Sequence, residues 1–83
     1  MDRFPAQVRA ARELLGFSQR ALAQAAEISR DAVIQAETGR NSTDRSRRAI
    51  VTALSKLGIE FLVDTERGRY GVILHVKDDV LPG

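Results

Sequence analysis

Residues 17–40 read FSQRALAQAAEISRDAVIQAETGR, and these residues carry the clearest structural signals in the chain. Ser18 and Ser29 each stand directly before a run with helical spacing, and serine is a preferred N-cap residue. Gly39 follows the second run, at the position where a glycine commonly ends a helix. The stretch therefore predicts two short helices joined by a short turn.

The apolar spacing on either side of this stretch predicts two more helices and then a change of period. Val8, Ala11 and Leu15 repeat at helical spacing before it. After Gly58, two runs rich in β-branched and aromatic residues are separated by a loop that contains Gly68, which is typical of a β-hairpin. The expected elements are helices over residues 5–15, 19–26, 30–38 and about 44–57, and strands over residues 59–63 and 72–76.

Two charged residues fall on the apolar sides of these helices. Arg12 lies between Val8 and Leu15 on the first helix, and Glu37 lies beside Val33 on the third. A charge that faces inward is costly unless it is paired. We therefore expect Arg12 and Glu37 to form a structural ion pair that holds the third helix against the first. The expected inner residues of the two central helices are Ala21, Leu22 and Ala25, and Val33, Ala36 and Glu37.

Composition excludes several classes of function. The 83 residues include no cysteine and a single histidine, His75, so neither a metal site nor a nucleophile–base set is expected. The sequence shows no carboxylate pair and no glycine-rich phosphate loop, so we expect neither an enzyme nor a cofactor. No apolar run approaches about 18 residues and no signal peptide precedes the first helix, so a cytoplasmic protein without a membrane span is expected.

Charge is distributed unevenly along the chain. Residues 1–58 carry ten basic and six acidic side chains, whereas residues 59–83 carry three and five. The basic excess is concentrated in the four arginines Arg40, Arg45, Arg47 and Arg48. A local basic patch on a nearly neutral chain is consistent with a polyanionic partner, and equally with a solvated charged surface.

The segments Phe17–Ala23, Ile28–Ser29 and Glu37–Arg40, together with Val33, resemble the XRE-type helix-turn-helix family, which includes the lambdoid phage repressors and their Cro proteins. The resemblance covers roughly residues 5–58. It implies a mainly α fold, a lambda-repressor-like helical DNA-binding domain of four to five helices, here followed by the β-hairpin. It also implies a transcriptional regulator, expected to be a repressor, that reads the major groove of a palindromic operator in double-stranded DNA as a dimer.

The outward side of the third helix carries side chains that can read bases. A recognition helix contacts base edges through its N-terminal half. Arg30 can donate two hydrogen bonds to guanine, and Gln35 can pair with adenine. Asp31 can accept from cytosine or orient Arg30, and Ile34 can contact a thymine methyl group. We therefore expect Arg30, Asp31, Ile34 and Gln35 to read bases.

Four other residues are expected to contact phosphates. The resemblance places Gln19 at the first turn of the second helix, where the family binds phosphate, and Ser18 adds the helix N-terminus beside it. Arg40 and Arg45 flank the loop after the third helix, at positions that reach the DNA backbone in the family. Glu27 departs from the family, which prefers a glycine, often left-handed, at this turn.

The tail, residues 59–83, is expected to act separately from the helical domain, residues 1–58. A lone two-stranded hairpin is marginal in water, so its apolar residues must pack on something. Pairing with a second copy is the favoured interpretation, which makes the tail the homodimer interface, and packing on its own helices is the alternative. A second hypothesis for the whole chain is an antitoxin whose tail binds a toxin while the helices regulate the operon.

Overall fold

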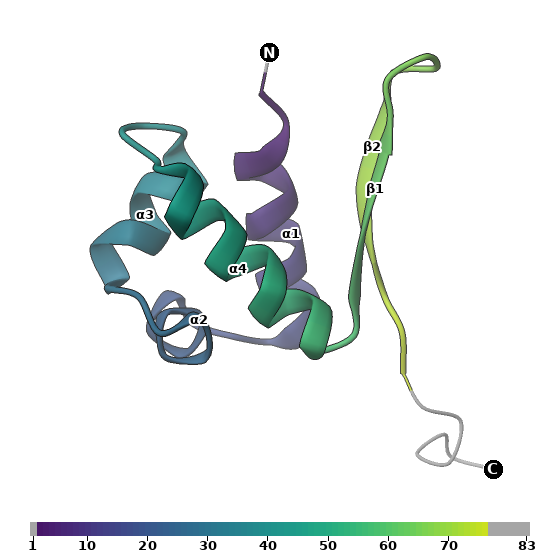
Figure 1. Cartoon of the computed structure of the whole chain (residues 1–83). Helices are drawn as coiled ribbons and strands as arrows, with labels where there is room; N and C mark the ends of the chain where they lie inside the picture. The colour runs from purple at the N-terminus through teal and green to yellow at the C-terminus, as the bar shows by residue number, and fades with distance from the viewer. Residues whose placement is uncertain (1, 77–83) are drawn as a thin grey trace, which may run out of the picture.

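The computed structural model describes residues 2–76, which form four helices followed by an antiparallel hairpin (Figure 1). Within this range the predicted fold, mainly helical with a C-terminal hairpin, is confirmed. The elements are α1 (Phe4–Leu15), α2 (Gln19–Ala26), α3 (Arg30–Thr38), α4 (Asp44–Lys56), β1 (Ile59–Asp64) and β2 (Arg69–Leu74).

The helix boundaries follow from local capping. The hydroxyl oxygens of Ser18, Ser29 and Thr43 each accept a hydrogen bond from the backbone N–H three residues later, at 3.0–3.1 Å. Each bond satisfies one of the N–H groups that the first turn of a helix leaves without a partner. Gly16 and Gly39 end α1 and α3 in the left-handed conformation. These boundaries lie where the serines and glycines predict them.

The core lies where α1, α2, α3 and α4 meet. Leu22 of α2 is fully buried at its centre. The prediction that Ala25 faces inward is wrong, because Ala25 is exposed and Ala23 is buried instead. Helix α2 packs against both α3 and α4, so its buried side turns toward Ala23. The buried core cluster consists of Val8, Ala11, Leu22, Ala23, Val33, Ala36, Ile50, Leu54 and Ile59.

The second strand differs from its prediction. Strand β2 covers Arg69–Leu74, and not residues 72–76. Pairing begins immediately after a tight turn in which the Asp64 carboxylate accepts from the backbone N–H of Arg67, at 3.2 Å. Gly68 supplies the positive φ of 65° that this turn requires. The register runs from Asp64 opposite Arg69 to Ile59 opposite Leu74, so the turn and not the apolar composition sets where β2 begins.

Gly58 joins α4 to the hairpin. Its φ is +97°, and a Cβ at this position would lie 2.7 Å from the backbone oxygen of His75. The backbone N–H of His75 donates to the carbonyl oxygen of Gly58 at 2.8 Å. Because a side chain would prevent this close approach, the end of the hairpin is held against the end of α4 only with glycine here.

The hairpin packs on helices of its own chain through one face. Gln7 of α1 is 6% exposed, and its Nε2 donates to the carbonyl oxygens of Leu62 and Gly71, both at 2.9 Å. The rings of Phe4 and Phe61 stack with their centroids 5.9 Å apart. Ile59 belongs to the core itself. The hairpin and the helices therefore share one hydrophobic core, whereas a dimer role for the tail stays a prediction.

Candidate nucleic-acid interface

Helix α3 divides cleanly into a buried and an exposed side. Val33, Ala36 and Glu37 are buried against the other helices. The four residues expected to read bases lie on the opposite side: Arg30, Asp31 and Gln35 are exposed and Ile34 is partly buried. Within residues 2–76 neither the Arg30 nor the Gln35 side chain has a hydrogen-bond partner in the protein, so both are available to a ligand.

A pocket of about 600 Å³ lies at the start of α2. Its lining brings together the N-cap Ser18, Gln19 and Arg20 of α2, Arg12 of α1, and Arg30 of α3. The guanidinium groups of Arg20 and Arg30 and the positive end of a helix therefore border one concave surface, an arrangement that suits a phosphate group. Arg20 was missed at the sequence level, although its place in the first turn of α2, next to Gln19, is a signal that could have found it.

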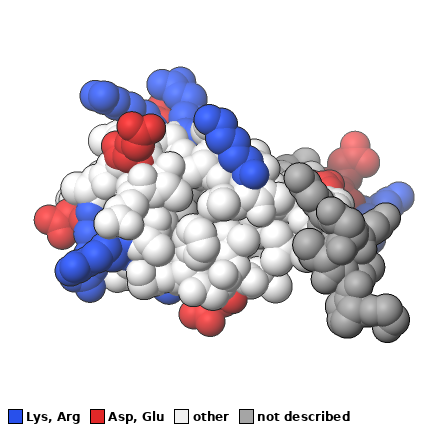
Figure 2. Space-filling model, turned by 90° about the horizontal axis from the view of Figure 1, so that it is seen from below, with Lys and Arg blue, Asp and Glu red and all other residues white. Residues whose placement is uncertain are grey.

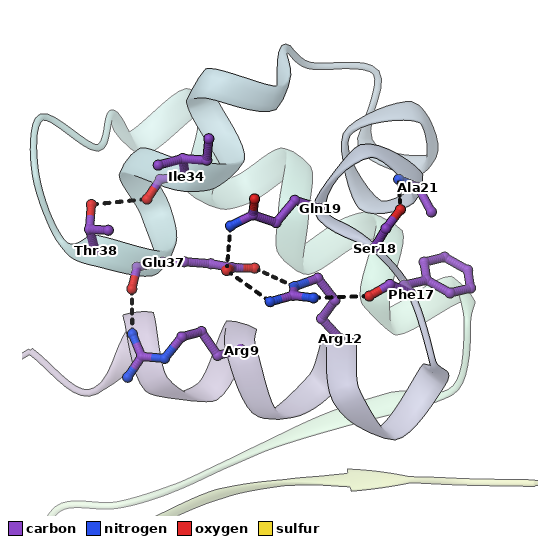
Figure 3. A network of polar contacts seen from close by, with 9 residues as sticks. All are labelled: Arg9, Arg12, Phe17, Ser18, Gln19, Ala21, Ile34, Glu37 and Thr38. Atoms are coloured by element: carbon purple, nitrogen blue, oxygen red, sulfur yellow. Dashed lines mark hydrogen bonds and ion pairs between the residues drawn. The ribbon is translucent and has the colours of Figure 1, made fainter.

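A hydrogen-bond network on Glu37 includes Arg12 and Gln19, which also line this pocket (Figure 3). The Glu37 side chain is 3% exposed, and Arg12 donates to it from Nε at 2.8 Å and from Nη2 at 3.3 Å. Gln19 donates from Nε2 to Oε1 of Glu37 at 3.1 Å. Arg12 also donates to the backbone oxygen of Phe17 at 3.1 Å, and Arg9 donates to the backbone oxygen of Glu37. The structure thus brings Arg12 and Glu37 together.

This network links three helices to the pocket at the start of α2. The hydrogen bond from Arg12 to Glu37, with the attraction of the two charges, raises the pKa of Arg12 above its usual value, although burial opposes the shift. Arg12 therefore stays charged. The Gln19 amide has two N–H groups, and Glu37 takes one of them, which leaves the other for a ligand in the pocket. Gln19 can in this way brace α3 and contact phosphate together.

The basic residues after α3 do not all point to the same surface. Arg40 and Arg45 are exposed, and Arg45 lines a groove with Ser29 and Ser46 between the beginnings of α3 and α4. Arg47 turns inward: its guanidinium lies 4.6 Å from the centroid of the Phe4 ring and forms an ion pair with Asp2. The four arginines that are close together in the sequence therefore do not all lie on one basic surface.

Figure 2 shows the end of the molecule that is lowest in Figure 1. Lys and Arg side chains stand at the left, over the end that α2 and α3 occupy, and along the upper rim of the view, with Asp and Glu side chains between them. An uncharged surface occupies the middle of this face. The charged side chains in this view therefore lie at its margin, and those that line the α2 pocket include Arg12, Arg20 and Arg30.

The turn between α2 and α3 is left-handed at Glu27, with φ 56° and ψ 43°. This is the conformation that the family often gives to a glycine at the same place. The backbone N–H of Ile28 donates to the carbonyl oxygen of Ala23 at 3.0 Å, so the turn also closes α2. A left-handed conformation costs a residue with a Cβ about 1–2 kcal/mol. Glu27 adopts the left-handed turn conformation despite this unfavourable energy.

Comparison with known families identifies residues 8–47 as a match to the family described as Helix-turn-helix. This segment is a helix-turn-helix DNA-binding domain of the XRE type. This helix-turn-helix protein is accordingly a DNA-binding transcription regulator. The matched residues include α2, α3 and the first turn of α4 and end before the hairpin. A comparison with curated proteins found no match.

Two further observations concern other functions. No helix within residues 2–76 is long and apolar enough to cross a membrane. In the same part of the chain, no three His, Asp or Glu side chains come together as a group that could hold a metal ion.

Proposed function

We propose that this protein is a sequence-specific repressor that binds a palindromic operator as a homodimer, with α3 in the major groove. The observation that carries the proposal is the exposed side of α3, where Arg30 and Gln35 have no partner in residues 2–76. Glu37 on the buried side anchors the same helix through Arg12. A rigid helix that presents unpaired guanidinium and amide groups matches the donor and acceptor pattern of base edges.

Base reading would divide among the four side chains by their chemistry. Arg30 would donate to O6 and N7 of guanine, and Gln35 would pair with N6 and N7 of adenine. Asp31, next to Arg30 in the first turn of α3, would accept from N4 of cytosine or orient the guanidinium. Ile34 is partly buried and its side chain has no hydrogen-bonding group, so it would contact a thymine methyl group.

Phosphate contacts would lie at the start of α2 and in the loop after α3. At the start of α2, Ser18, Gln19 and the newly found Arg20 share one pocket. Arg40 and Arg45 lie in the connection between α3 and α4 and at the start of α4. Contacts of this kind set the position of the recognition helix on the duplex and make binding sensitive to salt.

Dimer formation follows from the small number of bases that one helix can read. Two copies would place their recognition helices about 34–36 Å apart, one turn of DNA. We infer that the protein acts by occupying its operator in the cytoplasm, without catalysis and without a cofactor.

Selection of bound duplexes from a random DNA pool tests this proposal. We expect enrichment of a two-fold symmetric sequence with half-sites about 10–10.5 base pairs apart. The double variant Arg30→Ala/Gln35→Ala should fold normally, because both side chains are exposed, and should lose the sequence preference. Arg48→Ala, at an exposed position of α4, is the matched control and should select the same sequence. If the wild-type protein enriches no sequence, the proposal is wrong.

A further inference from the structure

The hairpin has a second face, which is turned away from the helices. Its centre is apolar: Leu62 of β1 is 41% exposed and Ile73 of β2 is 44% exposed. Gly71 lies directly opposite Leu62 in the register and on the same side as Ile73. The centre of this outward face is thus two large apolar side chains beside a gap where a side chain is missing.

Gly71 is not required by the fold of its own chain. A Cβ built at Gly71 would meet no atom within 4 Å, and its φ lies outside the left-handed region. This contrasts with Gly58, whose φ is +97° and whose Cβ would lie 2.7 Å from a backbone oxygen. Glycine also weakens a strand and often marks a place where another group approaches closely. The position therefore fits a site that a partner fills.

A pair of polar side chains closes the outward face at each end. At the turn end, Arg69 Nη2 lies 2.9 Å from Asp64 Oδ2, and at the other end His75 Nε2 lies 2.7 Å from Glu60 Oε1. An apolar centre with a polar rim is the usual anatomy of a protein interface. Each end offers both an acid and a base, so the face can meet a copy of itself without forcing like charges together.

We propose that the outward face of the hairpin binds the same face of a second copy, with an apolar side chain of one protomer seated over Gly71 of the other. The proposal rests on the dimer of the proposed function and names its surface. Two-fold symmetry makes the contact occur twice, because a two-fold interface uses the same patch on both subunits. Leu62 and Ile73 supply the apolar side chains and Gly71 supplies the space.

The size of the face sets the strength of the contact. Strands of six residues are about 20 Å long, and two strands with their side chains are about 10 Å wide, which gives roughly 200 Å² per protomer. A stable complex usually buries about 800 Å² per partner. The contact is therefore weak in solution, and it strengthens when DNA holds two copies on adjacent half-sites, because the effective concentration is then on the order of millimolar.

The variant Gly71→Val provides the sharpest test. The added side chain has room in the monomer and valine favours a strand, so the melting temperature should not fall. The same side chain fills the gap on the interface, so the dissociation constant of the dimer, measured by analytical ultracentrifugation up to millimolar protein, should rise at least about tenfold. Leu62→Lys should have the same effect on self-association. Leu14→Lys, which changes a leucine of α1 that is 50% exposed, is the matched control and should leave the dimer intact.

Two results would overturn the proposal. A wild-type chain that stays monomeric at millimolar concentration does not use this face for a second copy, which would leave a different protein, such as a toxin, as its occupant. If Gly71→Val and Leu62→Lys both self-associate as strongly as the wild-type protein, the dimer contact lies elsewhere. If Gly71→Val fails to fold, Leu62→Lys decides alone. A protein that dimerises as expected but enriches no DNA sequence refutes the proposed function and not this interface.

Discussion

Removal of Arg12 tests the internal support of the recognition helix. In Arg12→Ala, the Glu37 carboxylate, 3% exposed, loses its hydrogen bonds from Nε at 2.8 Å and Nη2 at 3.3 Å. Removing one partner of a buried ion pair lowers the free energy of unfolding by about 3–5 kcal/mol. Gln19 still donates to Glu37 at 3.1 Å, so we expect a loss near the lower end, about 3 kcal/mol.

A loss of this size is large for such a chain. Domains of 83 residues are stabilised by roughly 4–12 kcal/mol, so the variant would keep only part of its stability. Each kcal/mol lowers the melting temperature by about 4–8 °C at this size. Urea and thermal unfolding followed by circular dichroism measure the change. Arg48→Ala, an exposed arginine, is the matched control and should shift stability by less than about 0.5 kcal/mol.

The same pair predicts that the stability difference between wild type and Arg12→Ala does not depend on pH near neutrality. The Arg12 pKa is raised in the folded state, chiefly by its hydrogen bond to Glu37, so its stabilising contribution is complete below the unfolded pKa and is lost only as pH rises through the folded value. Because arginine already titrates above about pH 12, the difference between wild type and Arg12→Ala should be constant from about pH 7 to 10.

A second substitution separates the ion pair from other effects of Arg12. Glu37→Gln in the Arg12→Ala background removes the unpaired buried charge, so part of the lost stability should return. The reasoning is refuted if Arg12→Ala unfolds at the same urea midpoint as Arg48→Ala. It is also refuted if the losses from the two single substitutions simply add in the double variant.

Three further predictions concern DNA binding and the hairpin. Arg40→Ala and Arg45→Ala should weaken binding to all sequences alike and reduce the slope of log K against log salt by about 1 each; an unchanged slope would remove that residue from the phosphate contacts. Arg30→Ala and Gln35→Ala should each cost about 1–3 kcal/mol on the selected operator and relax preference at one base pair, whereas equal losses on scrambled DNA would contradict base reading. Gln7→Ala should cost about 1–3 kcal/mol and speed amide hydrogen exchange in the hairpin before that in the helices, because two backbone oxygens of the hairpin lose a buried donor; uniform exchange would refute the anchoring role.

Where the sequence predicts structure well, the interactions are local. Ser18 and Ser29 begin their helices through hydrogen bonds to backbone groups three residues away. Gly39 ends α3 because its own backbone adopts the left-handed conformation. Such signals need no knowledge of the remaining chain, so the four helices, and the exposed side of α3, could be placed from residue types and period alone.

The two errors occur where packing or pairing decides. Ala23 and Ala25 have the same small side chain, and only the contacts of α2 with α3 and α4 select the one that is buried. Strand β2 begins at Arg69 because the preceding turn puts it opposite Asp64. Apolar composition favours a strand further along, at residues 72–76, but a strand forms where its backbone finds a partner.

The helices, the presence of a hairpin, the family resemblance and the outward side of α3 could all be inferred from residue types and their spacing. Only the tertiary structure decided that Arg20 and Arg30, from different helices, line one pocket with Gln19. It alone also decided that Gln7 anchors carbonyl groups 55 and 64 residues away along the chain. The reason is physical: capping and helical period act within one turn of chain, whereas a pocket or an anchoring hydrogen bond depends on how separate segments pack.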